Sequence, residues 1–248
     1  MTRMRGFAYT QGKYLLDNQK HALLYASLLA VFSFTAWLSA AVVALITLRR
    51  GVKEGCFLLF VAVVTHIAVT QVKIPFFSAS INALLHFVPC FLAACILRFT
   101  ASWSAVYRVL FVQVLLVIAL LQQVAPDFIM AQFAYFQVVI KEMQPDGALS
   151  QFLAHINAEE SVSLANYLLG VQAAGIVVSA VLSLILARAV QSLLYYPGGF
   201  RREMLGFRGH KIELIMLVGI IFLANHANVF AIACEPALFC ADWDKFKL

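Results

Sequence analysis

The stretch HALLYASLLAVFSFTAWLSAAVVALITLRRG, residues 21–51, decides the fold. It is apolar from Ala22 to Leu48 and ends in two arginines. A helix that crosses a membrane needs about 20 apolar residues, because it rises about 1.5 Å per residue through roughly 30 Å of hydrocarbon. The run is longer than one such span requires. It therefore forms either one long helix or two short helices that meet near Phe32–Trp37.

The composition of the chain favours a membrane protein. Of its 248 residues, 63% are hydrophobic and only 12% are charged, and a soluble domain of this size could not hide so much apolar surface. Further apolar runs extend over Gly55–Val72, Ser80–Leu97, Val106–Gln123, Leu164–Leu194 and Ile212–Ala233. We therefore predict an all-α fold, a polytopic integral membrane bundle of six to seven transmembrane helices that forms one membrane domain over residues 1–248.

Charge at the ends of the apolar runs predicts how the bundle lies in the membrane. Basic residues stand on both sides of the first run, at Lys13 and Lys20 before it and at Arg49, Arg50 and Lys53 after it. Basic short loops prefer the cytoplasm, which favours two helices, over about 13–32 and about 35–49, because both basic segments then lie inside. The alternative is one long span with an outside N-terminus.

The remaining loops agree with the two-helix topology. The basic loop 188–211 is then cytoplasmic, and the loop 125–163, whose charged residues are mostly acidic, is outside. Within the outer loop, Phe128–Met143 has near-helical apolar spacing and is expected to lie at the membrane interface or over the mouth of the bundle. We expect a multi-pass protein of a bacterial inner (cytoplasmic) membrane, with the lipid bilayer as its partner. The net charge of +6 comes with no nucleic-acid-binding motif, so nucleic acid is not an expected partner.

Two segments carry a family resemblance. They are WLSAAVVALITLRRG, residues 37–51, and LLYYPGGFRREMLGFR, residues 193–208, together with the helix spacing between them. Over most of residues 20–225 the chain resembles the YybS-like family of bacterial membrane proteins, which has no assigned function. That family is distantly similar in fold to the S components of energy-coupling-factor vitamin transporters. The resemblance implies a small-solute-binding, S-component-like subunit of a transport system.

Three alanines at a spacing of four residues form one smooth helix face, at Ala36, Ala40 and Ala44. Small residues let membrane helices approach closely and gain dispersion contacts. In S components a similar face docks the transmembrane coupling subunit, so the resemblance implies a partner-docking face on another membrane protein subunit. The alternative is packing within the chain.

Several polar residues stand inside apolar runs, where an unpaired polar group costs a few kcal/mol. They should therefore face the bundle interior or a water-filled cavity. One interpretation is a binding pocket for a small solute, and the alternative is hydrogen bonding between helices. The candidate ligand-binding residues are His66, His86, Gln113, Asn225, His226 and Asn228.

The turn after the run Leu164–Leu194 is a second docking candidate. Proline and glycine prevent helix continuation there, and basic residues follow, in the order Pro197, Gly198, Gly199, Phe200, Arg201 and Arg202. This segment either docks a partner or only fixes the topology. It lacks the residue pattern of a nucleotide-binding phosphate loop.

The last candidates are two cysteines. Cys234 and Cys240 could close a disulfide in an oxidising compartment or remain free thiols. The sequence has no G-x-S-x-G or H-E-x-x-H motif and no pair of carboxylates inside a span, so it predicts neither an enzyme nor a metal or cofactor site. The functional alternative to solute binding is a non-transporting envelope scaffold or assembly protein that acts through protein partners.

Overall fold

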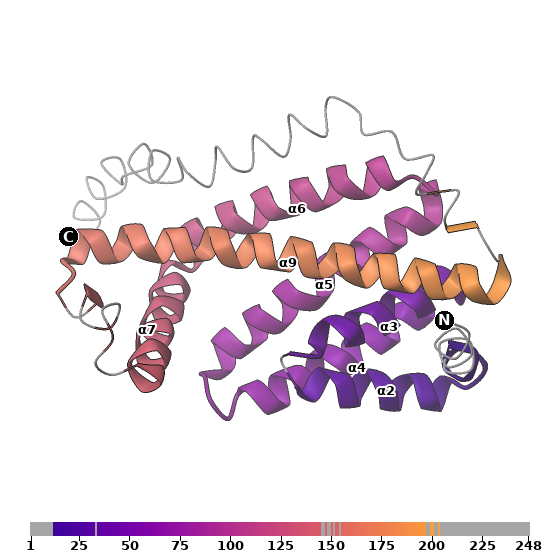
Figure 1. The fold of residues 1–248 in the computed structure, drawn as a ribbon, viewed down its shortest axis with the longest axis horizontal. Coiled ribbons are helices and arrows are strands. Elements are labelled where there is room, and N and C mark those ends of the chain that lie inside the picture. Colours follow the sequence, from indigo (N-terminus) through magenta and orange to yellow (C-terminus); the bar gives the residue numbers. More distant parts are fainter. Residues whose placement is uncertain are drawn as a thin grey trace, which may run out of the picture. The chain divides into compact units, whose positions relative to one another are not determined.

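The structure, a computed structural model, describes residues 12–32, 34–144, 147, 150, 152–153, 155–196, 199–200 and 203. Over these residues it consists of helices and their connections, without a strand, and so confirms the predicted all-α class. The main helices are α2 (Gln19–Val31), α3 (Ala36–Arg49), α4 (Val52–Thr70), α5 (Phe76–Thr100), α6 (Trp103–Val124), α7 (Pro126–Met143) and α9 (Ala158–Tyr195), as Figure 1 shows.

The first apolar run forms two helices. α2 ends at Val31 and α3 begins at Ala36, and the two helices pack against each other. At the corner, the Thr35 hydroxyl donates to the carbonyl of Leu29 at 2.8 Å, which satisfies a carbonyl that the end of α2 leaves free. The favoured two-helix prediction is confirmed, and the alternative of one long helix is wrong.

Among the described residues, four helices are long and apolar enough to cross a membrane: Val52–Thr70, Phe76–Thr100, Trp103–Val124 and Glu160–Tyr195. They coincide with four of the predicted runs. The full count of six to seven spans is not confirmed. α2 and α3 have 13 and 14 residues, which gives each a length of roughly 20 Å. The predicted run Ile212–Ala233 lies outside the described residues.

The described residues fall into two compact units. The first contains those up to Val117 and those from Ala173 onwards, and the second contains Ile118–Gln172. That the chain forms a single membrane domain stays a prediction.

Helix α3 forms the centre of the first unit. Of its 14 residues, 11 are buried, and it contacts α2, α4 and α5 (Figure 1). Its many alanines allow these neighbours to approach closely. α2 follows the same rule with Ala22, Ala26 and Ala30, which are all buried, while Leu24 and Leu28 on its other face are exposed.

Tight turns connect α3 to α4 and α5 to α6. Between α3 and α4, Gly51 has a φ of 126°, a backbone conformation that favours glycine. One turn later, Gly55 lies so close to α3 that an added Cβ atom would stand 2.0 Å from Oγ1 of Thr47. After α5, Ala101 closes the helix in the left-handed conformation, with a φ of 50°.

The second unit contains α7 with the end of α6 and the start of α9. The predicted helix Phe128–Met143 is confirmed as α7, which begins at Pro126 directly after α6. It buries Phe128 and Phe133 and exposes Met130 and Tyr135. That α7 lies at a membrane interface stays a prediction.

Candidate functional site

The structure brings together two of the predicted ligand-binding residues. His66 on α4 and His86 on α5 stack with 6.2 Å between ring centroids, and both rings meet Phe87 edge-on. Nδ1 of His66 donates a hydrogen bond of 2.9 Å to the carbonyl oxygen of Ala30. His66 therefore completes the end of α2, whose last carbonyls have no partner within the helix.

The other predicted pocket residues do not join this pair. Gln113 lies on α6, and none of the described hydrogen bonds or ring contacts connects it to the histidines. Both polar atoms of its side chain, like Nε2 of His86, are buried without a hydrogen-bond partner among the described residues. Asn225, His226 and Asn228 lie outside the described residues.

The predicted alanine face lies inside the chain. Ala36, Ala40 and Ala44 are 1%, 2% and 0% exposed, because the neighbouring helices of the first unit cover them. These three alanines are therefore not an accessible surface for docking a partner, and packing within the chain, the alternative at this face, accounts for them.

Two buried serines join helices in the same way as His66. The hydroxyl of Ser39 donates to the carbonyl of Ala26 on α2 at 2.8 Å. The hydroxyl of Ser183 on α9 donates to the carbonyl of Trp37 on α3 at 2.7 Å. The side chains of Ser39, His66 and Ser183 thus donate hydrogen bonds to backbone carbonyls on adjacent helices.

The strongest concentration of charge lies at one end of the first unit, where α2, α4 and α6 begin and α3, α5 and α9 end. We call it the basic end. Its described cations are Lys13, Lys20, Arg49, Arg50, Lys53, Arg98, Arg108 and Arg188, and its described carboxylates are Asp17, Glu54 and Glu203. At the other end, between α4 and α5, stands Lys73. The first unit is therefore strongly asymmetric in charge along its helices.

Hydrogen bonds hold the basic end together. Nη1 of Arg98 donates to the carbonyls of Thr47 and Leu48, at 2.9 Å each, and so completes the C-terminal turn of α3. Arg50 donates to the carbonyl of Leu16, which brings the segment before α2 against the turn after α3. The two basic segments that flank the first apolar run thus lie at the same end.

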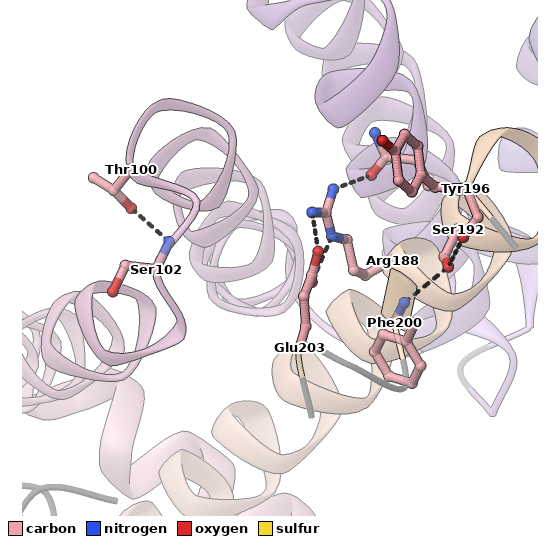
Figure 2. Close-up of polar contacts among 8 residues, drawn as sticks. Thr100, Ser102, Arg188, Ser192, Tyr196, Phe200 and Glu203 are labelled. Carbon is pink, nitrogen blue, oxygen red and sulfur yellow. Dashed lines mark hydrogen bonds and ion pairs between the residues drawn. The ribbon is translucent and has the colours of Figure 1, made fainter. Parts of the chain in front are cut away.

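The described residues that follow α9, which are Tyr196, Gly199, Phe200 and Glu203, turn back onto that helix (Figure 2). The Ser192 hydroxyl donates to the carbonyl of Tyr196 and accepts from the backbone N–H of Phe200, at 2.9 Å in both bonds. Gly199 donates from its backbone N–H to the carbonyl of Tyr196, also at 2.9 Å. We call Tyr196, Gly199, Phe200 and Glu203 the tail turn.

An ion pair fixes the tail turn at Glu203. The guanidinium of Arg188 donates from Nε and Nη2 to the two carboxylate oxygens of Glu203, at 3.0 and 2.5 Å (Figure 2). It is the one ion pair found among the described residues. Nη1 of Arg188 also donates to the side-chain oxygen of Gln191 at 2.8 Å. This two-bond geometry is the most specific that arginine and a carboxylate form.

Sequence reasoning found the tail turn but not the residues that fix it. Of the predicted docking residues, Gly199 stands in the turn, whereas Pro197, Gly198, Arg201 and Arg202 lie outside the described residues. Cys234 and Cys240 lie outside them too. Ser192, Arg188 and Glu203 were missed, although opposite charges on both sides of a proline-glycine turn are a readable signal. The described residues contain no group of three or more metal-ligating side chains.

No family model matches the chain, and neither a curated protein nor a solved structure matches it. The resemblance to the YybS-like family stays a prediction. What the fold defines is a class of protein: the described part of the chain is all-helical, and four of its helices are long and apolar enough to cross a membrane.

Proposed function

We propose that this chain is a membrane-embedded scaffold or assembly protein that binds an acidic protein partner through the tail turn at its basic end. The observation that carries the proposal is the fixed conformation of the tail turn, held by Ser192 and by the pair of Arg188 with Glu203. A loop that only sets the membrane topology acts through its positive charge and does not need a fixed conformation. In this proposal the basic end faces the cytoplasm of a bacterial inner membrane.

The charge balance suits an acidic partner. Glu203, the carboxylate in the tail turn, is bound by Arg188 and so does not oppose a second negative surface. Other exposed cations of the basic end, among them Lys20 and Lys53, have no ion pair within the described part of the chain. Charge of this kind steers a partner of opposite sign and selects against basic ones.

Site-specific photocrosslinking tests the proposal. A benzoylphenylalanine at Tyr196, which is 76% exposed, places the crosslinker in the tail turn without replacing a side chain that fixes it. We expect one adduct of constant mass, which Arg201→Glu with Arg202→Glu abolishes. Arg108→Glu is the matched control, since it reverses an exposed arginine at the same end on α6. An adduct that survives the double reversal, or is lost equally with Arg108→Glu, would refute the docking role.

A second candidate function is the solute-binding, S-component-like subunit that the family resemblance implies. Its support is the set of buried polar atoms without partners, Nε2 of His86 and the amide of Gln113, because such groups call for water or a ligand. Mass spectrometry of small molecules released from the purified protein tests it. A bound solute that disappears with Gln113→Leu would favour this function, and a protein that releases none would count against it.

A further inference from the structure

An exposed arginine at the basic end rests on a tyrosine. Arg49, the last residue of α3, places its Cζ atom 3.6 Å from the ring centroid of Tyr195, the last residue of α9. Stacking occupies the flat face of a guanidinium and leaves the N–H donors on its edge available. No carboxylate of the described chain pairs with Arg49. The side chain is thus held in position with its charge unused.

A second guanidinium stands at the same helix end. Arg98 uses Nη1 for the carbonyls of Thr47 and Leu48, and its Nη2 lies 3.8 Å from where a Cβ atom would stand on Gly51. Its charge, like that of Arg49, meets no carboxylate in the residues that the structure describes. Two positioned guanidinium groups therefore flank the turn between α3 and α4.

The surroundings of these arginines point to a lipid. Exposed aromatic side chains accompany them, with Phe99 at 73% and Tyr196 at 76% exposed, and Tyr195 itself is exposed. All three stand at the ends of helices long enough to cross a bilayer. Aromatic belts of this kind mark the depth of the lipid headgroups, where basic side chains meet phosphates.

We propose that Arg49 and Arg98 form a binding site for the phosphate of an anionic phospholipid headgroup. The planar fork of a guanidinium matches two phosphate oxygens, which a lysine ammonium cannot do. Tyr195 acts as the platform that orients Arg49, and the end of α3 orients Arg98. This site does not depend on the tail turn or on a protein partner.

Titration of the delipidated full chain in a neutral detergent tests the site. Native mass spectrometry would count bound phosphatidylglycerol, with phosphatidylcholine and inorganic phosphate as separate arms. We expect phosphatidylglycerol to bind most tightly, and Arg49→Lys to weaken it about tenfold although the charge remains, since a strong charge-assisted hydrogen bond is lost. Tyr195→Phe should keep the binding, because the ring remains, and Tyr195→Leu should lose it.

The matched control is Arg108→Lys, which makes the same change at another exposed arginine of the basic end. Equal weakening by Arg108→Lys would show that only diffuse charge attracts the lipid and would overturn the site. A protein that binds phosphatidylcholine as tightly as phosphatidylglycerol would also overturn the site. Inorganic phosphate that binds as tightly as phosphatidylglycerol would assign the site to a free ion and overturn the lipid proposal. Circular dichroism of each variant confirms that the helices are retained.

Discussion

Replacement of Gly55 by alanine probes the closest approach between α3 and α4. The new Cβ atom would lie 2.0 Å from Oγ1, 2.9 Å from Cβ and 3.0 Å from Cα of Thr47. Thr47 is buried, and its hydroxyl donates to the carbonyl of Val43 at 2.7 Å, so rotation of the side chain breaks a bond. Rotation would not relieve the close contact between the new Cβ atom and Cα of Thr47. The two helices must therefore move apart.

The size of the effect follows from two opposing contributions. Overpacking a closely packed core costs about 1–3 kcal/mol. Exchanging glycine for alanine inside a helix returns about 1 kcal/mol. We therefore expect Gly55→Ala to lower the free energy of unfolding by up to about 2 kcal/mol. Gly175→Ala is the matched control on α9, because its new Cβ atom meets nothing within 4 Å and the variant should be slightly more stable.

Unfolding in mixed micelles by a denaturing detergent, followed by circular dichroism, measures both variants. A cycle with Thr47→Ala adds a second check, since that change should cost less in the Gly55→Ala background than in the natural chain. If Gly55→Ala proves as stable as Gly175→Ala, then α3 and α4 do not approach at this point and the packing derived for α3 is wrong.

Three further stability changes follow from single contacts, and the same unfolding assay measures each. Ala101→Gly should raise the free energy of unfolding by about 1 kcal/mol, because it removes the cost of a left-handed alanine; a loss would contradict that backbone conformation. Arg98→Met should lower it by about 1–2 kcal/mol through two lost bonds to α3, whereas no change would mean that these bonds contribute nothing. His66→Phe keeps a ring beside His86 but leaves the carbonyl of Ala30 unpaired, and should cost about 1–2 kcal/mol.

The sequence predicted the helices well where hydropathy and charge acted together. Arg49 and Arg50 after the first apolar run, with Lys13 and Lys20 before it, indicated two helices there, because only that arrangement gathers these cations at one end. Length alone would have allowed a single span. The same reasoning could not show that α3 is enclosed by its neighbours, since an alanine face fits a partner or the same chain equally well.

The candidate site was harder to predict for a similar reason. A histidine in an apolar run indicates that a polar partner is needed but does not name it, and for His66 the partner is a backbone carbonyl 36 positions earlier in the chain. Backbone carbonyls at helix ends leave no mark in the sequence. Arg98, which completes the end of α3, was not among the candidate residues for the same reason.

The central claim is that two short helices return the chain to the end at which it started. Single cysteines at Lys20, Lys53 and Lys73, each in a chain free of its own cysteines, would be labelled in sealed vesicles with a maleimide that cannot cross the membrane. We predict that positions 20 and 53 react from the same side and position 73 from the opposite one. Labelling of position 20 from the same side as position 73 would contradict the account.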